Sequence, residues 1–283
     1  MPWRSFPANL KILAFLPFIL GACGLTGPIQ PTSVQAGYSV TRNVIYTPPS
    51  WPEKIPGDLY RPAGQNHAAP AVLLIHGGGW TGSDGRWQMA PIAKQLAKRG
   101  YVVLNVTYRL APKYRYPEPV EDMREAVRWM RAHAVEAGID ADRIATFGYS
   151  AGGYLAAMTG YDIKTNQIRA VVAGGTPANL ALYPGGDLIP QFLGGKRDEI
   201  PRRFAEASPV NHVSNLSPPT FVYHATADKL VPLEQAWALI GELESYKVAH
   251  EIYWIEGRDH IPAFLFPSEA VNKAIDFLDR NMR

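Results

Sequence analysis

Short apolar runs alternate with longer amphipathic runs along most of the chain. Eight apolar runs predict β-strands, at residues 40–46, 55–60, 71–75, 101–106, 144–147, 170–173, 220–223 and 251–255. The central runs consist mainly of consecutive Val, Ile, Leu and Ala residues, and such strands are covered on both faces. The amphipathic runs predict helices at residues 88–99, 120–137, 151–159, 233–246 and 268–281. This alternation is typical of an α/β fold with a mostly parallel central sheet of about eight strands and helices on both faces.

Residues 176–219 follow neither the helical nor the strand period and are rich in Pro and Gly. We therefore expect a small insertion over the edge of the sheet, placed where it could shape a pocket. The sheet itself matters for chemistry because open parallel sheets bind ligands beyond the carboxyl ends of their strands. Catalytic residues are accordingly sought just after the predicted strands.

The composition is that of a globular protein, with 47% hydrophobic and 19% charged residues among 283. At this length one large domain buries an ample core, so we expect a single domain at residues 40–283. Lys and Arg exceed Asp and Glu by only 28 to 25, without a long basic run, so a nucleic-acid partner is not indicated. Histidine, cysteine and acidic residues show no metal-ligand spacing, and no metal or cofactor is expected.

The N-terminal residues 1–22 have the three-part composition of an export signal peptide. Basic Arg4 and Lys11 precede an apolar run at residues 12–20, after which small residues lead to the single cysteine, Cys23. The apolar run is about half the length of a membrane-spanning helix, which disfavours a permanent transmembrane anchor. The protein is therefore expected to work outside the cytoplasm.

The stretch Leu20-Gly21-Ala22-Cys23 resembles the processing box of bacterial lipoproteins, in which the cysteine is lipidated and becomes the mature N-terminus. Lipidation of Cys23 would anchor an otherwise exported protein to a membrane. Cleavage as an ordinary secretory signal, with Cys23 left as a free thiol, is the alternative. Residues 23–39 are rich in Gly, Pro, Thr, Ser and Gln, and we expect a flexible tether there.

Three sequences at predicted strand ends point to acyl chemistry. The first is Gly148-Tyr149-Ser150-Ala151-Gly152, between the strand at 144–147 and the helix at 151–159. A serine on so sharp a strand-to-helix turn adopts strained backbone angles, and the flanking glycines leave room to present its hydroxyl. Ser150 is the predicted nucleophile.

The second sequence is His76-Gly77-Gly78-Gly79-Trp80, directly after the strand at 71–75. Successive glycines let backbone N–H groups turn toward one point, as an oxyanion requires. We assign Gly78, Gly79 and Ala151 as the donors. A phosphate-binding loop is the alternative, but it would end in a Lys-Ser or Lys-Thr pair, whereas Trp80 and Thr81 stand here.

A serine nucleophile needs a base, and the base needs an acid that orients it. Asp228 follows the strand at 220–223, and His260 follows the strand at 251–255. Asp259 would compete with Asp228 for the acid role, although sequence neighbours rarely face each other in the required way. Asp122, His76 and His224 are expected to be packing or structural residues. His212 is the one further histidine to test as a base.

The resulting order Ser, Asp, His is that of the α/β-hydrolase fold. From about residue 70 to 260 the chain resembles carboxylesterases of the hormone-sensitive-lipase group and of the feruloyl and acetylxylan esterase-like (BD-FAE-like) group. The resemblance rests on the two motifs above, on Asp228 with Val231-Pro232 after it, and on Tyr108-Arg109-Leu110-Ala111-Pro112. It implies that Ser150 is the nucleophile, His260 the general base and then acid, and Asp228 the residue that orients the imidazole.

Two departures favour the BD-FAE-like group. Tyr149 stands where the hormone-sensitive-lipase group usually has Asp, and the region before residue 71 is too short for that group's large helical cap. The resemblance implies hydrolysis of short-chain, acylated-sugar or aryl esters through an acyl-enzyme, with a small-molecule ester as partner. Trp80 and Tyr149 are candidates to line the acyl or aryl pocket. Acyl length, alcohol identity and oligomeric state stay open.

Two rival functions remain for the same motifs. An amide hydrolase, such as an arylformamidase or peptidase, would use the same nucleophile and oxyanion donors. A binding module without catalysis is the second rival, because some hydrolase folds have lost their chemistry. The complete set of Ser150, Asp228 and His260 favours an enzyme.

Overall fold

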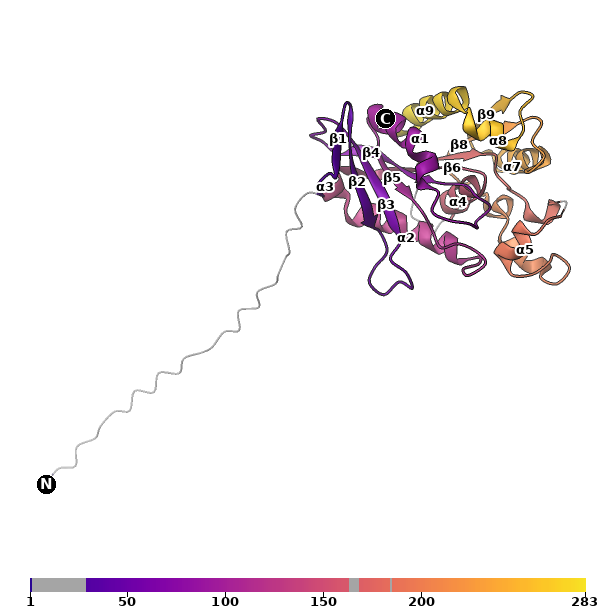
Figure 1. Ribbon diagram of the computed structural model, residues 1–283, viewed down its shortest axis with the longest axis horizontal. Coiled ribbons are helices and arrows are strands. Elements are labelled where there is room, and N and C mark those ends of the chain that lie inside the picture. Colours follow the sequence, from indigo (N-terminus) through magenta and orange to yellow (C-terminus); the bar gives the residue numbers. More distant parts are fainter. Residues whose placement is uncertain (2–28, 163–167, 184) are drawn as a thin grey trace.

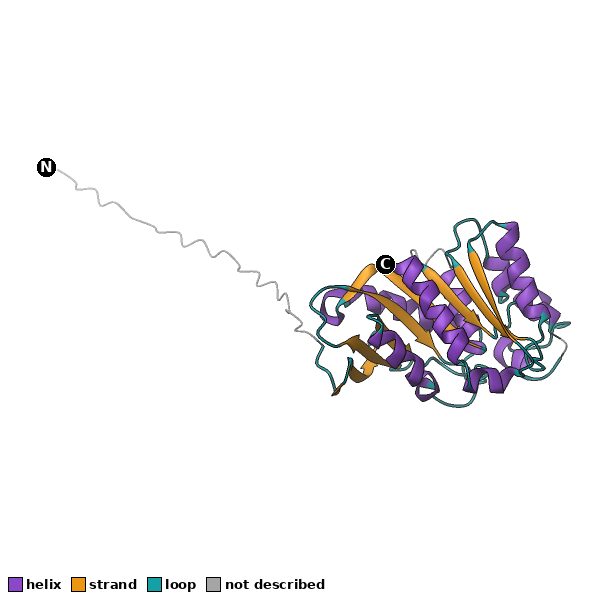
Figure 2. Cartoon of the chain, turned by 90° about the horizontal axis from the view of Figure 1, so that it is seen from above, coloured by secondary structure: helices purple, strands orange, loops and turns teal. Residues whose placement is uncertain are grey.

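The computed structural model describes residue 1 and residues 29–162, 168–183 and 185–283. Within them, nine strands form one sheet in the order β1-β2-β3-β5-β4-β6-β7-β8-β9 (Figures 1 and 2). The pairs from β1 to β5 are antiparallel, and all pairs from β5 to β9 are parallel. The strands are β1 Ser33–Gln35, β2 Tyr38–Ile45, β3 Pro56–Pro62, β4 Ala69–Ile75, β5 Val102–Val106, β6 Ile139–Tyr149, β7 Ala170–Gly174, β8 Thr220–Ala225 and β9 His250–Ile255.

Helices cover both faces of the sheet, as the continuous apolar strands predicted (Figure 2). In β4, Leu73 and Ile75 belong to one core cluster and Val72 and Leu74 to the other, because alternate side chains point to opposite faces. One cluster includes α2 Glu118–Ala132, α4 Ala151–Gly160 and α7 Glu234–Ser245; the other includes α1 Arg86–Lys98 and α9 Ser268–Met282. The predicted mostly parallel α/β sheet is confirmed.

The predicted helix at 120–137 is wrong in its last turn. The chain leaves the helical conformation at His133, so that α2 is followed by a separate turn, α3 Ala134–Ala137. The His133 ring stacks on Trp129 with ring centroids 4.6 Å apart, and its Nδ1 lies 3.0 Å from the Trp129 carbonyl oxygen. The His133 backbone N–H also donates to the Trp129 carbonyl. Competition between the ring and the backbone N–H for this carbonyl weakens the helical hydrogen bond at His133.

The predicted flexible tether is wrong from residue 29 onward. The Thr32 N–H donates to the Val40 carbonyl at 2.7 Å, and β1 pairs with β2 across a turn in which Gly37 has a φ of 87°. Only glycine adopts this conformation at low cost, so Gly37 itself favours the turn. The pairing of β1 with β2 has no such local signal. The domain therefore begins before residue 40. Apart from Met1, the predicted leader and Cys23 lie outside the described residues.

The insertion at 176–219 lies between β7 and β8, and its described residues form only short helical turns. They are η2 Leu180–Leu182, α5 Leu188–Leu193, α6 Pro201–Glu206 and η3 Pro209–His212. Each has six residues or fewer, too short to give a periodic signal in the sequence. Within residues 176–183 and 185–219, no large helical cap forms over the carboxyl edge of the sheet.

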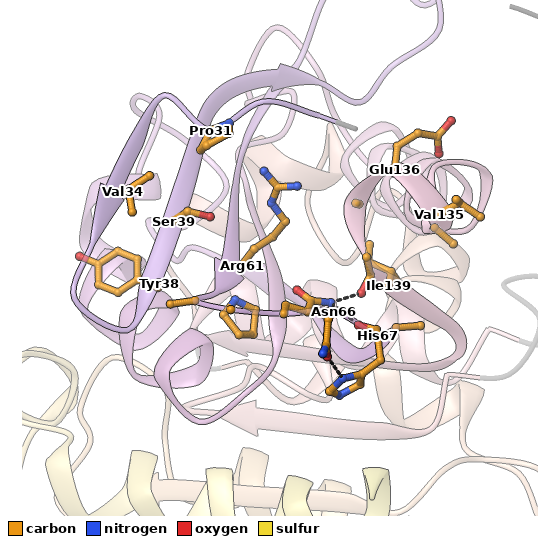
Figure 3. Close-up of a pocket in the computed structure, with 18 residues that line it drawn as sticks. Pro31, Val34, Tyr38, Ser39, Arg61, Asn66, His67, Val135, Glu136 and Ile139 are labelled. Atoms are coloured by element: carbon orange, nitrogen blue, oxygen red, sulfur yellow. Dashed lines mark hydrogen bonds between the residues drawn. The ribbon is translucent and has the colours of Figure 1, made fainter. Parts of the chain in front are cut away.

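A cavity of about 700 Å³ lies at the opposite end of the sheet (Figure 3). It is lined by the β1–β2 hairpin, the loop after β3, α3 and Ile139, the first residue of β6. Arg61 on its wall donates to the Ile29 carbonyl, and burial lowers the pKa of the Arg61 guanidinium.

No helix in the described ranges is long and apolar enough to cross a membrane.

Candidate active site

Ser150 is held at a sharp turn between β6 and α4, with a φ of 57° and a ψ of −125°. A positive φ at a residue with a Cβ costs on the order of 1–3 kcal/mol and persists only where the surroundings impose it. The surroundings here are tight: a Cβ on Gly148 would lie 2.1 Å from the Gly152 oxygen, and one on Gly152 would lie 2.2 Å from the Ile75 oxygen. Both glycines are therefore required for the turn that presents the Ser150 hydroxyl.

The structure brings Ser150, His260 and Asp228 together at the carboxyl edge of the sheet. The His260 Nε2 lies 2.9 Å from the Ser150 Oγ, and its Nδ1 lies 2.6 Å from the Asp228 Oδ2. A carboxylate only accepts hydrogen bonds, so Nδ1 carries the proton and Nε2 is free to accept the serine proton. These contacts join residues that are 110 and 32 positions apart in the chain.

The Asp228 carboxylate is buried and held from both sides. Its Oδ1 accepts the backbone N–H groups of Leu230 at 3.0 Å and Val231 at 2.7 Å, which leaves Oδ2 for His260. His224 secures the same turn, because its Nε2–H donates to the Val231 carbonyl at 2.8 Å. His224 is 1% exposed, and burial lowers the pKa of its imidazole. The neutral ring adds no charge beside Asp228, 3.7 Å away.

Asp259 caps the helix that begins at His260 and does not contact the imidazole nitrogens. This helix is α8 His260–Leu265, which the sequence did not predict. The Asp259 Oδ1 accepts the backbone N–H groups of His260 at 2.7 Å and Lys229 at 2.9 Å, and these two hydrogen bonds lower the pKa of its carboxyl. The cap therefore fixes the first turn of α8, and His260 is the first residue of that turn.

Tyr149 and Trp80 are buried supports in this structure, which corrects the prediction that they line a substrate pocket. Tyr149 is 2% exposed, its ring centroid lies 4.9 Å from that of His260, and its hydroxyl donates to the His260 carbonyl at 2.8 Å. Trp80 is 3% exposed and stacks on Phe192 of α5 at 4.4 Å. Their aromatic character was visible in the sequence, but the direction of each side chain was not.

The glycine loop, defined here as residues 76–79, lies directly over the Ser150 turn. A Cβ on Gly77 would lie 3.3 Å from the Ser150 Cβ and 2.9 Å from the Tyr149 oxygen. Gly78 and Gly79 have φ values of 108° and 62°, which turn successive peptides in directions that other residues rarely allow. Leu188 of the insertion packs on Gly79, since a Cβ there would meet it at 3.0 Å.

The remaining sequence candidates have other partners. The Asp122 carboxylate accepts the Arg109 Nε–H and the Trp51 Nε1–H, each at 2.8 Å, and burial raises the pKa of its carboxyl. His212 lies in the insertion, where its Nε2 meets the Glu206 carbonyl at 2.7 Å. The sequence predicted a packing role for His224, and its buried hydrogen bond to Val231 confirms this. It did not predict that Tyr149 supports His260, because an aromatic residue at the end of a strand carries no signal of the direction of its side chain.

The sheet order and a Ser–His–Asp arrangement at its carboxyl edge define an α/β-hydrolase fold. Comparison with known families makes this specific. The family model of BD-FAE matches residues 57–243, about two thirds of the chain, and the protein belongs to that family.

Individual relatives agree with this placement. The chain is 31% identical over 205 residues to the probable carboxylic ester hydrolase LipM of Mycobacterium tuberculosis, covering 65% of this chain and 47% of that protein. It is 29% identical over 196 residues to esterase LipC of the same organism, covering 62% and 49%. The chain thus matches only about half the length of these curated relatives.

Solved structures share the fold over most of the chain. A truncated form of a carbohydrate esterase from gut microbiota superposes with a TM-score of 0.78 at 23% identity, covering 90% of this chain and 99% of that one. Esterase 2 of Thermogutta terrifontis, in a structure phosphonylated by sarin, superposes with a TM-score of 0.73 at 25% identity, covering 83% and 93%.

Proposed function

We propose that this protein is a serine carboxylesterase that cleaves its substrate through an acyl-enzyme. The observation that carries the proposal is the continuous hydrogen-bonded path from the Ser150 Oγ through His260 to Asp228, with spacings of 2.9 and 2.6 Å. A hydroxyl, a base and an orienting carboxylate in this order are the requirements for nucleophilic catalysis by serine. Membership of the BD-FAE family and the esterase names of the relatives support it.

In the first step the Ser150 Oγ attacks the ester carbonyl carbon while its proton passes to the His260 Nε2. The carbonyl π electrons move to oxygen, and the tetrahedral intermediate carries the negative charge there. Asp228 stabilises the imidazolium and keeps it oriented. The intermediate then collapses, the bond to the alcohol oxygen breaks, and His260 returns the proton to the leaving alcohol.

Three backbone N–H groups are assigned to the oxyanion: those of Gly78, Gly79 and Ala151. The position of the glycine loop over the Ser150 turn supports the assignment. Ala151 is the first residue of α4, and the first N–H groups of a helix lack an internal partner. Fixed donors of this kind cost no reorganisation when charge develops, which is why they favour the transition state.

Water is the second substrate. His260 removes a proton from it, the resulting nucleophile attacks the acyl carbon, and collapse of the second intermediate returns the proton to Ser150 and releases the acid. No cofactor takes part in either step of this proposal. We expect short-chain, aryl or acylated-sugar esters as substrates, and the carbohydrate esterase among the structural neighbours supports the last class.

The test begins with purified protein and p-nitrophenyl acetate, followed by labelling with a fluorophosphonate. Ester turnover and labelling at Ser150 are expected together. Labelling without turnover of any ester would contradict the proposal, as would turnover that a fluorophosphonate leaves unchanged. Matched aryl esters and anilides distinguish esterase from amidase. A panel of short-chain, long-chain, feruloyl and acetyl-sugar esters then ranks the substrate classes by kcat/KM.

Export is part of the proposal, with Cys23 as a lipidated N-terminus that anchors the enzyme to a membrane outside the cytoplasm. The charge and apolar pattern of residues 1–22 supports it. Metabolic labelling with a fatty acid in a bacterial host, followed by mass spectrometry of the mature N-terminus, tests it. We expect the wild-type protein to carry the fatty-acid label and the Cys23→Ser variant to lack it. An unlabelled protein cut at another position would indicate ordinary secretion.

A further inference from the structure

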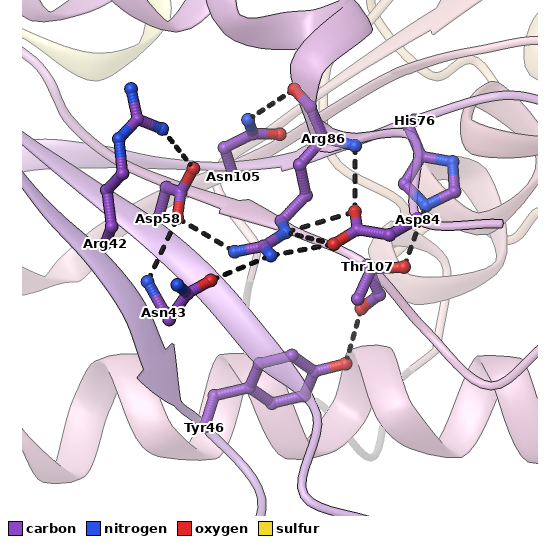
Figure 4. Close-up of polar contacts among 9 residues, drawn as sticks. All are labelled: Arg42, Asn43, Tyr46, Asp58, His76, Asp84, Arg86, Asn105 and Thr107. Carbon is purple, nitrogen blue, oxygen red and sulfur yellow. Dashed lines mark hydrogen bonds and ion pairs between the residues drawn. The ribbon is translucent and has the colours of Figure 1, made fainter.

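A network of charged side chains lies near His76, the first residue of the glycine loop (Figure 4). At its centre is Arg86, the first residue of α1, whose side chain is 12% exposed. Its Nη1 donates to the Asp58 Oδ1 at 2.8 Å, its Nη2 donates to the Asn43 Oδ1 at 2.9 Å, and its Nε donates to the Asp84 Oδ2 at 2.8 Å. One guanidinium therefore joins the antiparallel strands β2 and β3 to the segment that follows the glycine loop.

That segment folds back onto the glycine loop through His76. A Cβ on Gly85 would lie 2.6 Å from the His76 Nδ1, so the backbone next to Asp84 lies against the imidazole. The His76 Nδ1–H donates to the Gly77 carbonyl at 2.7 Å, and its Nε2 accepts from the Thr107 hydroxyl at 3.1 Å. A shift of Asp84 would thus be passed to His76 and to the Gly77 peptide.

Gly77 packs against the turn that carries the nucleophile. A Cβ at Gly77 would lie 3.3 Å from the Ser150 Cβ. The Gly77 carbonyl and the proposed donor N–H of Gly78 belong to one peptide unit, and the proposed donor N–H of Gly79 belongs to the next. A displacement of about 1 Å in a catalytic group is enough to cost on the order of 100-fold in rate. The loop therefore needs a rigid attachment, and its glycines give it little rigidity of its own.

The charges of the network balance. Asp58 and Asp84 face Arg86, and the second oxygen of Asp58 accepts from the Arg42 Nη1 at 2.9 Å. Burial acts to raise the pKa of Asp84, but hydrogen bonds from Arg86 prevail and hold it below its ordinary value. Partly buried ion pairs are a weak source of net stability because desolvation offsets their attraction. Their defined geometry is the more direct consequence.

We propose that Arg86 is a positioning residue of the active site, which fixes the glycine loop against Ser150 by holding Asp84 to Asp58. The proposal rests on the proposed function, in which the loop stabilises the oxyanion. Because the oxyanion exists only after attack, loss of the link should reduce transition-state stabilisation and leave ground-state binding nearly unchanged.

The first experiment compares Arg86→Gln with Arg42→Gln. We expect Arg86→Gln to lower kcat about 10- to 100-fold with KM within about threefold. Arg42→Gln is the matched control, because Arg42 pairs with the same Asp58 but makes no contact with Asp84 among the described residues, and its side chain is half-exposed. Its kcat should stay within about twofold of wild type. Circular dichroism and the melting temperature confirm that each variant is folded.

A second variant keeps the proposal testable if Arg86→Gln does not fold. Asp84→Asn removes the charge from a side chain that is 41% exposed and retains its size. It should lower kcat in the same way, though less. The double variant should lose no more than the larger single effect, because both substitutions break one link.

Binding of a trifluoromethyl ketone supplies a readout that a general loss of stability would not change. Attack by Ser150 on this inhibitor creates an oxyanion, so Arg86→Gln should weaken inhibition by the same factor as kcat/KM. A kcat for Arg86→Gln equal to that of Arg42→Gln, or a loss confined to KM, would overturn the role of Arg86. An inactive, unlabelled wild-type protein would overturn the proposed function itself.

Discussion

The two sides of Ser150 are held by different kinds of interaction. On the glycine-loop side, we propose an attachment through paired charges centred on Arg86. On the acid side, the Asp228 turn is held by backbone N–H groups and by His224, whose pKa burial lowers. The difference follows from what each side must do. A fixed cation near Asp228 would compete with His260 for the Asp228 carboxylate. The glycine loop presents only backbone dipoles, so paired charges nearby do not compete with it.

The largest effect is expected from Ser150→Ala, which removes the atom that both sides serve. We expect kcat for p-nitrophenyl acetate to fall by about 10⁵-fold or more, with only binding and the oxyanion donors left. Steady-state kinetics on purified protein measure it, and Ser39→Ala on β2 is the control. Substantial turnover by the folded Ser150 variant would place the nucleophile elsewhere.

Asp228→Asn comes next and tests the acid side directly. The amide still fills the buried site, but it no longer fixes the tautomer with the proton on the His260 Nδ1, and kcat should fall by about 10⁴-fold. Asp259→Asn serves as the comparison, since the Asp259 carboxylate accepts the backbone N–H groups of His260 and Lys229 instead of the imidazole N–H. A larger loss in Asp259→Asn than in Asp228→Asn would reverse the assignment of the acid.

His224 separates hydrogen bonding from packing on the acid side. His224→Leu removes the donor to Val231 and should lower kcat about tenfold, whereas the side-chain amide of His224→Gln can still donate to that carbonyl and should restore most of the activity. Kinetics of both variants, with His212→Leu as a control in the insertion, measure it. Equal losses in the Leu and Gln variants would show that only ring packing matters.

The smallest effect concerns stability and pH. Burial lowers the pKa of both His76 and His224, so the unfolded chain, with His pKa near 6.5, binds protons that the folded chain does not. The free energy of unfolding should therefore decrease as pH falls from about 7 toward 5, by up to about 1.4 kcal/mol per pH unit for each histidine. Urea unfolding of wild type and His224→Gln checks it; identical slopes would contradict the contribution of His224.

The sequence determined eight of the nine described strands, the longer helices α1, α2, α4, α7 and α9, and the sharp turn at Ser150, because apolar runs and glycine spacing are local signals. It also placed Asp228 and His260 after strands whose carboxyl ends share one edge of a parallel sheet. Local chemistry was enough for these predictions, since each depends on a few neighbouring residues and on the general geometry of parallel sheets.

Only the tertiary structure decided which side chains face the catalytic groups. Tyr149 was expected in a substrate pocket but lies behind His260, and β1, which pairs with β2, lies in a segment that was expected to be a tether. The proposed link from Arg86 to the glycine loop combines residues from β2, β3 and α1, which no window of the sequence brings together. Side-chain direction and long-range pairing depend on the packing of distant segments, so a local pattern carries no information about them.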